Sequence, residues 1–231
     1  MVFDKLASVR SSIAAAAHRA GRAPGSVELM AVLKYAPPDE VRALLESKQV
    51  RHAGDNRVQD AERRESRFEN RESNIQYHLI GHLQSNKAKK AVQLFDWIDS
   101  VDSMELAERL EREAAALGKT LNVLVQVQTA PNPGQSGAQP EQLGGLLERM
   151  RRLPHLKVSG LMAIAPMTDP VEAVRPHFRR MKVLLDEHFA GGEAPVLSMG
   201  MSRDYEVAVE EGATLVRIGS LLFGETPRQP S

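Results

Sequence analysis

Short apolar segments rich in valine, isoleucine and leucine alternate along this chain with longer charged segments in which apolar residues recur at helical spacing. The first kind is typical of buried β-strands and the second of amphipathic helices. Strands are predicted over residues 28–33, 50–53, 77–80, 97–101, 121–127, 157–161, 195–197 and 214–218. Helices are predicted between them, over residues 38–47, 57–70, 86–94, 103–117, 140–152, 171–189 and 203–211.

This alternation predicts an α/β protein in which crossover helices join parallel strands. Eight strand–helix units in 231 residues fit a TIM (β/α)8 barrel, with a doubly wound open sheet as the alternative. An additional helix before the first strand is indicated by apolar residues at Phe3, Leu6, Val9, Ile13, Ala17 and Ala20. We expect this helix to plug or flank the barrel, and we expect residues 1–231 to form a single domain.

Composition narrows the setting of this barrel. The chain is 42% hydrophobic and 26% charged, with 30 basic and 30 acidic residues, so it can bury a full core and has no basic excess for nucleic acid or an anionic membrane. There is no cysteine, and the histidines lack the spacing of a metal site. No apolar run approaches the length of a membrane span, and the N-terminus has no signal-like apolar region. A cytoplasmic protein is expected.

Lys34 ends the apolar run 29–33 and is followed closely by Pro37 and Pro38, which cannot continue a strand. Its amine is therefore expected at the mouth of the barrel, where TIM barrels carry their functional residues. A lysine there is ordinarily a solvated strand end. The alternative is a nucleophile that forms an imine with a carbonyl compound.

Two segments at neighbouring strand ends have the composition of a phosphate site. Residues 198–202 read Ser-Met-Gly-Met-Ser after the seventh predicted strand, and Gly219-Ser220 follows the eighth. Small residues let the backbone approach an anion, hydroxyls donate to it, and TIM barrels commonly bind phosphate at these two loops. Each segment alone is more simply a structural turn, but two at adjacent strands favour phosphate binding.

Arg217 lies inside the apolar run 215–218 and points to the opposite side of the strand from Val216 and Ile218. A buried charge requires compensation. The sequence therefore leaves two interpretations, an ion pair with a carboxylate of the barrel or a contact with a ligand near the phosphate site.

Seven segments of the chain match a known family nearly end to end. They are Ala-Val-Leu-Lys at 31–34, Gly-Asp-Asn-Arg-Val-Gln at 54–59, His-Leu-Ile-Gly-His-Leu-Gln-Ser-Asn-Lys at 78–87, Ser-Val-Asp-Ser at 100–103, Gly-Leu-Met at 160–162, Leu-Ser-Met-Gly-Met-Ser at 197–202 and Val-Arg-Ile-Gly-Ser at 216–220. With these motifs the chain resembles the pyridoxal phosphate homeostasis proteins, single-domain relatives of bacterial alanine racemase.

The resemblance implies a site for the cofactor pyridoxal 5′-phosphate. It implies that Lys34 forms an imine with the cofactor aldehyde and that Arg217 lies by the pyridine nitrogen. Asn56 and Met162 would line the pocket. The phosphate would be held by Ser198, Met199 through its backbone, Ser202, Gly219 and Ser220. For His82 and Asn86 the resemblance suggests positions near the rim of the pocket, without a defined task.

A cation beside the pyridine nitrogen disfavours its protonation and makes the ring a poorer electron sink. Racemisation also needs acid and base groups on both faces of the imine. In alanine racemase a tyrosine of a separate C-terminal domain serves the second face, and this sequence ends at Ser231 without such a domain. The resemblance thus implies a carrier in pyridoxal phosphate homeostasis rather than an enzyme. A racemase of low activity is the alternative.

The resemblance also bears on assembly and partners. A monomer is expected, and apo-enzymes that use the cofactor are possible recipients of it.

A different function remains as an alternative. A class I aldolase acting on sugar phosphates would use a barrel lysine and a phosphate site equally well. The chain departs from the family pattern at Asp55, where glutamate is commoner, and at Leu33 and Tyr35, where small hydroxyl residues are commoner. It also departs at Gln135, where many relatives have a lysine associated with cofactor handling.

Overall fold

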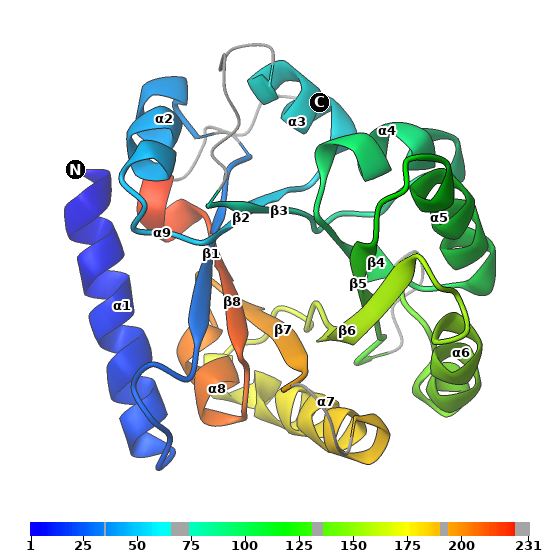
Figure 1. Ribbon diagram of the computed structural model, residues 1–231. Helices are drawn as coiled ribbons and strands as arrows, with labels where there is room; N and C mark the ends of the chain where they lie inside the picture. Colours follow the sequence, from blue (N-terminus) through cyan, green and yellow to red (C-terminus); the bar gives the residue numbers. More distant parts are fainter. Residues whose placement is uncertain (35, 66–73, 131–135, 190–193, 225–231) are drawn as a thin grey trace.

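Eight parallel strands close into a barrel in which each strand pairs with the next along the chain and β8 pairs with β1 (Figure 1). The computed structural model describes residues 1–34, 36–65, 74–130, 136–189 and 194–224. The strands are β1 (Glu28–Val32), β2 (His52–Asp55), β3 (Gln76–Leu79), β4 (Trp97–Val101), β5 (Leu121–Gln126), β6 (Leu156–Met162), β7 (Val196–Met201) and β8 (Leu215–Ile218). The predicted TIM barrel is confirmed, and the open sheet is excluded.

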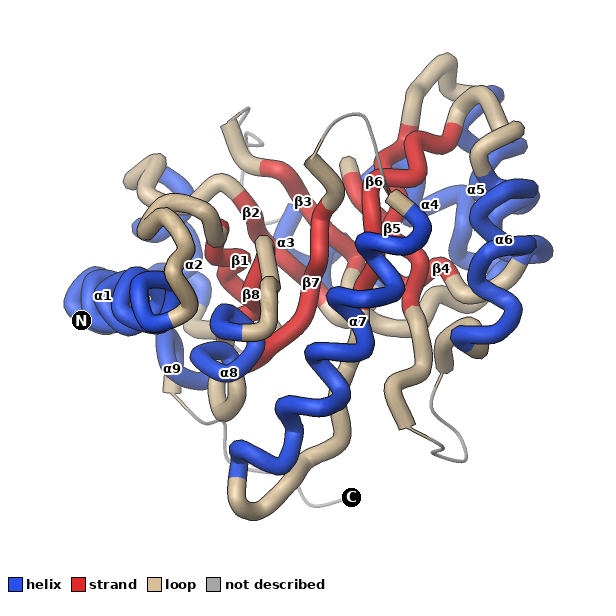
Figure 2. The backbone as a smooth tube through the Cα atoms, turned by 90° about the horizontal axis from the view of Figure 1, so that it is seen from below, coloured by secondary structure: helices blue, strands red, loops and turns tan. Residues whose placement is uncertain are grey.

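Helices surround the barrel and cover the outer faces of its strands (Figure 2). The α-helices are α1 (Val2–Arg19), α2 (Pro38–Glu46), α3 (Val58–Glu65), α4 (Ala88–Leu94), α5 (Met104–Ala116), α6 (Leu143–Met150), α7 (Arg175–His188), α8 (Tyr205–Glu210) and α9 (Ser220–Phe223). Three short 3-10 helices precede α4, α6 and α7, namely η1 (Ser85–Lys87), η2 (Pro140–Gln142) and η3 (Val171–Val174). Figure 2 shows α4, α5 and α6 together on one side of the barrel and α1, α2, α8 and α9 on the other.

The N-terminal helix α1 flanks the barrel and does not plug it. It runs along the outside of the ring in Figure 1 and contacts α8, α9 and α2. Its inward face carries Leu6, Ile13 and Ala17, which are buried in the same apolar cluster as the outer faces of the strands. Truncating a fully buried leucine such as Leu6 to alanine typically costs about 2–5 kcal/mol, so this helix contributes substantially to stability.

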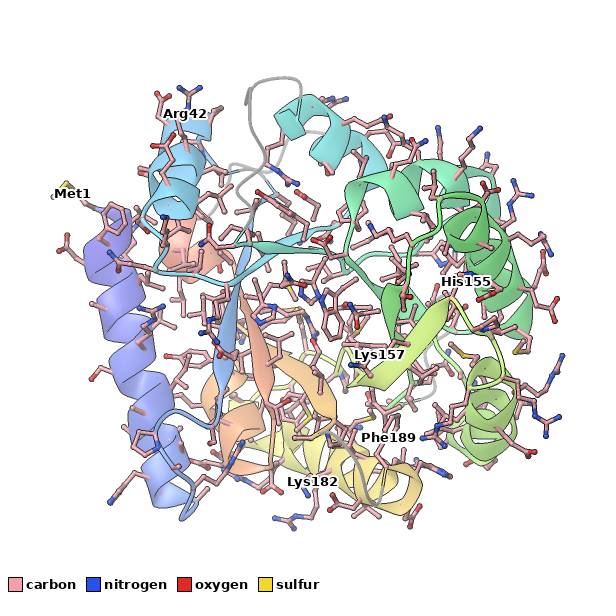
Figure 3. All side chains as sticks on the ribbon, viewed as in Figure 1. Met1, Arg42, His155, Lys157, Lys182 and Phe189 are labelled. Atoms are coloured by element: carbon pink, nitrogen blue, oxygen red, sulfur yellow. The ribbon has the colours of Figure 1, made fainter. Side chains whose placement is uncertain are left out.

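Alternate residues of each strand point in opposite directions and build two separate apolar regions. The larger region lies between strands and helices and includes the fully buried Phe95 and Phe178. A smaller cluster inside the barrel consists of Met30, Val32, Ile80 and Leu215. Side chains fill the space that the strands enclose (Figure 3), as expected for a TIM barrel, whose centre is a packed core.

Two strand boundaries differ from the sequence prediction in a way that affects the site. The second strand, predicted over 50–53, spans His52–Asp55, because Gly54 and Asp55 pair with His78 and Leu79 of β3. The seventh, predicted over 195–197, runs on to Met201, where it pairs with Arg217 of β8. Ser198, Met199 and Gly200 therefore belong to a strand and not to a loop. Pairing between strands, which local sequence does not encode, decides both cases.

Among the residues that the structure describes, no helix is both long enough and apolar enough to cross a membrane. Within the same residues, no three His, Asp or Glu side chains gather as a metal site would require. Tyr35, Gln135 and residues 66–70 of the helix predicted over 57–70 lie outside the described residues.

Candidate functional site

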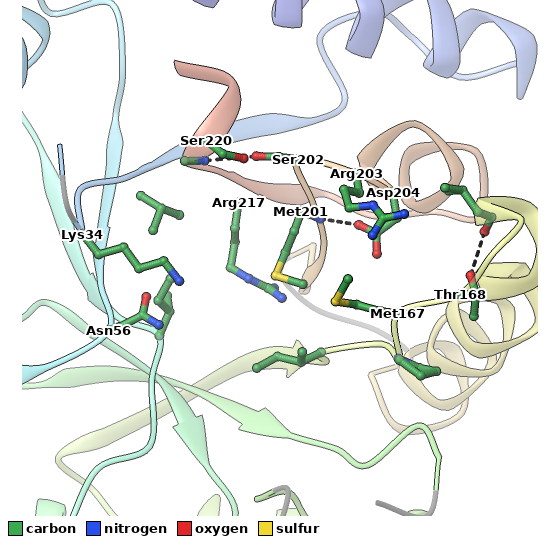
Figure 4. A pocket seen from close by; sticks show the side chains of 16 residues that line it. Lys34, Asn56, Met167, Thr168, Met201, Ser202, Arg203, Asp204, Arg217 and Ser220 are labelled. Atoms are coloured by element: carbon green, nitrogen blue, oxygen red, sulfur yellow. Dashed lines mark hydrogen bonds between the residues drawn. The ribbon is translucent and has the colours of Figure 1, made fainter. Parts of the chain in front are cut away.

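A cavity of about 330 Å³ opens at the C-terminal ends of β1, β2, β7 and β8, with the segment after β6 as one wall (Figure 4). This volume is at the lower end of the range for small-molecule sites. Its polar lining residues are Lys34, Asn56, Thr168, Ser202, Arg203, Asp204, Arg217 and Ser220. Its remaining lining residues are Val32, Ile80, Ile164, Pro166, Met167, Val171, Met201 and Gly219. The face is the one on which TIM barrels place their functional groups.

Lys34 stands two residues beyond the end of β1, and its side chain extends into the cavity (Figure 4). Asn56 directly follows β2, and its side chain lies below that of Lys34 in the same view. The Oδ1 atom of Asn56 is buried and has no hydrogen-bond partner among the described residues. Such an atom is costly to leave unsatisfied, so this oxygen is suited to accept a hydrogen bond from a ligand. Gly81 supports this arrangement, because a Cβ at that position would collide with the backbone carbonyl oxygen of Asn56.

Ser202 and Ser220 lie side by side at another edge of the cavity (Figure 4). The backbone N–H of Gly219 donates to Oγ of Ser202 over 3.4 Å, which ties the two strand ends together. Helix α9 begins at Ser220, so first-turn N–H groups without intrahelical acceptors accompany the two hydroxyls. Hydroxyl and amide donors at one edge form an arrangement suited to an anion.

Arg217 belongs to β8, and its almost completely buried side chain extends between Lys34 and Met201 (Figure 4). Its Nη1 donates to Oγ of Ser198 over 2.8 Å and its Nη2 to the carbonyl oxygen of Ala163 over 2.9 Å. Burial lowers the pKa of Arg217, and the nearby carboxylates of Asp99 and Asp204 oppose that effect. The structure does not show the ion pair that the sequence allowed: among the described residues, the two acceptors that hold the guanidinium are neutral, and Arg217 lines the cavity instead.

Asp204 brings a carboxylate to the cavity that the sequence did not single out. Its Oδ1 accepts a hydrogen bond of 2.6 Å from the backbone N–H of Met201 and so shapes the turn between β7 and α8. Burial raises the pKa of Asp204, while the Met201 hydrogen bond and the charge of Arg217 lower it. Asp204 is the second residue of the helix predicted over 203–211 and the N-cap residue of the observed α8, a position at which aspartate is common.

The structure brings six of the nine predicted site residues together on one surface. Those lining the cavity are Lys34, Asn56, Ser202, Arg217, Gly219 and Ser220. Met162, Ser198 and Met199 do not line it. They are fully buried, and Met162 is aligned with Ser198 between β6 and β7. For Ser198 and Met199 the reason is the length of β7, which runs on to Met201 and leaves both residues below the mouth of the barrel.

His82 lies outside the cavity, where its Nδ1 is 3.0 Å from Oγ of Ser136. Sequence reasoning missed the wall formed by residues 164–171, which contributes Met167 and Thr168. No strand end or turn motif marks those two side chains as site residues. Their position depends on how the segment after β6 folds back over the barrel mouth.

Comparison with known proteins places the chain in a family. A model of the family described as alanine racemase, N-terminal domain, matches residues 5–227. The pyridoxal phosphate homeostasis protein of Aquifex aeolicus is 38% identical over 224 residues, which cover 96% of this chain and 97% of the relative. That of Pseudomonas aeruginosa is 39% identical over 223 residues, covering 96% of this chain and 95% of the relative.

Solved structures agree with this result. PipY of Synechococcus elongatus, determined with pyridoxal phosphate bound, is 37% identical, superposes with a TM-score of 0.83, and is matched over 97% of this chain and 100% of its own. An alanine racemase of Clostridium difficile shares the fold, with a TM-score of 0.70 at 16% identity, covering 87% of this chain and 53% of the racemase. The chain therefore belongs to the family of the alanine racemase N-terminal domain and, within it, to the pyridoxal phosphate homeostasis proteins.

Proposed function

We propose that this protein binds pyridoxal 5′-phosphate in the cavity at the barrel mouth and takes part in intracellular homeostasis of that cofactor. The observation that carries the proposal is the convergence of Lys34, Arg217 and the Ser202–Gly219–Ser220 edge on one cavity. An amine, a cation and an anion-binding edge match the aldehyde, the ring nitrogen and the phosphate of the cofactor. The cofactor in the PipY structure supports the same assignment.

The residues present fit this cofactor. The buried Oδ1 atom of Asn56 requires a hydrogen-bond donor, and none of the described residues supplies one. The cavity volume of about 330 Å³ accommodates a small ligand with one aromatic ring and one phosphate. Apolar side chains, among them Val32, Ile80 and Ile164, line the space between the polar groups and suit the faces of a ring.

When bound, the cofactor supplies an aldehyde carbon with which an amine can condense with loss of one water. The chain provides that amine at Lys34, which is exposed to the cavity. Arg217 is held by Ser198 and Ala163, and it presents its charge where protonation of a neighbouring pyridine nitrogen would be disfavoured. Ser202, Gly219 and Ser220 bind and orient the phosphate.

We infer a carrier rather than a racemase. Racemisation requires a second acid–base group opposite the lysine, and in alanine racemase a tyrosine fills that role. Of the tyrosines that the structure describes, neither Tyr77 nor Tyr205 lines the cavity. The names of the relatives as homeostasis proteins support this inference. Racemase activity of low rate is the competing proposal.

Purified protein tests the binding proposal directly. Protein saturated with pyridoxal 5′-phosphate is expected to be yellow, and reduction with borohydride is expected to fix the cofactor on the peptide that contains Lys34, as measured by mass spectrometry. Lys34→Ala should abolish the labelled peptide. Lys89→Ala, which changes an exposed lysine of α4, serves as the control. Labelling that requires a sugar phosphate substrate and no cofactor would instead support an aldolase.

The carrier role needs its own measurement. Cofactor transfer from loaded protein to an apo-enzyme should proceed, and racemisation of L-alanine should be absent from racemase-free preparations. Sustained turnover that disappears in Lys34→Ala would overturn the carrier proposal and favour the racemase. We further propose a monomer that acts in the cytoplasm, to be checked by light scattering and by cell fractionation.

A further inference from the structure

The sulfur chemistry of this protein rests on its nine methionines, because the chain has no cysteine. Two of them, Met1 and Met167, are 90% and 80% exposed. The others are partly or fully buried, namely Met30, Met104, Met150, Met162, Met181, Met199 and Met201. Oxidation of a thioether requires that the oxidant reach the sulfur, so oxidants in solution meet Met1 and Met167 first.

The two exposed methionines occupy very different places. Met1 lies at the start of α1, outside the ring of strands (Figure 3). Met167 lines the cavity at the barrel mouth. In the view of Figure 4 it lies on the other side of Arg217 from Lys34, and its sulfur is open to the cavity as well as to solvent. Chemistry at Met167 therefore alters the site, whereas chemistry at Met1 does not.

The segment that carries Met167 is held by hydrogen bonds on both sides of this side chain. Before it, the backbone N–H of Ala163 donates to the carbonyl oxygen of Ser198 over 3.0 Å. After it, Oγ1 of Thr168 donates to the carbonyl oxygen of Val171 over 3.3 Å. The exposure of Met167 is thus a property of an anchored wall of the cavity and not of a loose chain end.

We propose that Met167 is a site of reversible oxidation by hydrogen peroxide, and that its oxidation weakens the binding of an aromatic ligand in the cavity. The sulfur lone pair attacks one peroxide oxygen, the O–O bond breaks as the S–O bond forms, and after a proton shift the second oxygen leaves as water. Sulfur loses the two electrons that the peroxide gains. Sulfoxide reductases reverse the change with electrons from thiols.

The effect on binding rests on the function proposed above and follows from the change in polarity. Met167 shares its wall with the apolar side chains of Ile164, Pro166 and Val171. A thioether contacts aromatic rings favourably, whereas the sulfoxide is polar and chiral. Affinity for pyridoxal 5′-phosphate should therefore fall about threefold to tenfold on oxidation, as expected for the loss of one sulfur–aromatic contact. The buried methionines should stay reduced, so the melting temperature should change little.

The experiment treats cofactor-free, full-length protein with hydrogen peroxide, removes the peroxide with catalase, and locates each sulfoxide by peptide mass spectrometry. Dissociation constants for pyridoxal 5′-phosphate are measured before and after treatment. Each variant is compared with its own untreated sample. Met167→Leu should show no loss of affinity on treatment, while Met104→Leu, which changes a partly buried methionine of α5, should show the full wild-type loss.

Two further measurements separate this effect from general damage. Met167→Gln, which places a polar side chain of similar length in the wall, should bind the cofactor more weakly than wild type without any peroxide. Sulfoxide reductases acting on both epimers, with dithiothreitol as the reductant, should restore the affinity of treated wild type. Lost affinity that they fail to restore would contradict a reversible effect.

The two parts of the proposal fail in different ways. Oxidation of Met167 no faster than that of the buried Met199 would refute the modification site. Sulfoxide at Met167 with unchanged affinity, or an equal loss in treated Met167→Leu, would refute its effect on binding. Wild type that binds no cofactor before treatment would refute the proposed function, and the effect on binding with it. The peptide map would still decide whether Met167 is the oxidised residue.

Discussion

Oγ of Ser198 accepts a hydrogen bond of 2.8 Å from Nη1 of Arg217 inside the barrel, below the cavity. Both residues were expected to contact the cofactor, but only Arg217 lines the cavity. Ser198 instead holds the guanidinium from beneath. The pair shows how a residue of a phosphate-type motif can serve the site by fixing the position of another side chain.

Ser198→Ala should therefore act mainly on stability. The substitution leaves one N–H group of a buried cation without its acceptor, and such a loss costs about 1–3 kcal/mol. Urea denaturation of the cofactor-free protein measures it. Ser202→Ala, which removes a hydroxyl at the cavity edge, should cost less stability and reduce affinity for the cofactor more. The reverse ranking of the two variants would show that Ser198 does not support Arg217 in this way.

Asn56→Ala, unlike Ser198→Ala, should lower affinity for the cofactor and have little effect on stability. Because Oδ1 of Asn56 is buried without a partner, its removal should leave the free energy of unfolding of the cofactor-free protein nearly unchanged or slightly higher. Affinity for pyridoxal 5′-phosphate should fall roughly tenfold, as expected for one lost hydrogen bond. Equilibrium dialysis and thermal melts check the two halves. A marked loss of stability with intact affinity would refute a ligand-binding role.

Gly200 of β7 tests the local geometry beside the cavity. Its φ is +89°, and a Cβ there would lie 2.5 Å from the Cβ of Ala208 in α8. Gly200→Ala should thus combine backbone strain with a clash and destabilise the protein by more than about 2 kcal/mol. Gly21→Ala is the matched control, since Gly21 has φ +68° and no atom near its would-be Cβ. Equal losses of stability in the two variants, measured by chemical denaturation, would mean that α8 shifts enough to relieve the clash.

Stability should depend on pH through His52. Its folded pKa, about 3, is depressed below the ordinary value of 6.5, so between these values the unfolded chain binds a proton that the folded protein refuses. The contribution of His52 to the free energy of unfolding is fully present above pH 6.5 and is lost progressively as the pH falls towards 3. At pH 5 the loss is about 2 kcal/mol.

Two carboxylates act in the opposite sense, because burial raises the pKa values of Asp55 and Asp204. The effect of His52 must therefore be measured as a difference. Urea unfolding of wild type and His52→Gln at pH 7.5 and pH 5 gives it, with the variant expected to lose less stability on acidification. Identical losses in both proteins would show that His52 is not the group responsible.

Local patterns determined the barrel, the order of its elements and the cluster of strand-end residues. Parallel strands must end at one face, so the strand pattern brought Lys34, Ser202, Gly219 and Ser220 together, whereas Asn56 and the ligand-facing position of Arg217 came from the family resemblance. The family motifs added the cofactor. Both steps use information that is local in the chain, either periodicity or a short run of residues.

The tertiary structure alone decided which residues lie above the strand ends and which lie below. Pairing of β7 with β8 lengthened β7 to Met201 and moved Ser198 from the cavity to the interior, where it holds Arg217. Folding of residues 164–171 over the mouth added Met167 and Thr168. The interior also joined Asp99, His78 and His52, which come from three strands. These relationships depend on register and burial across the barrel, and no single segment of sequence encodes either.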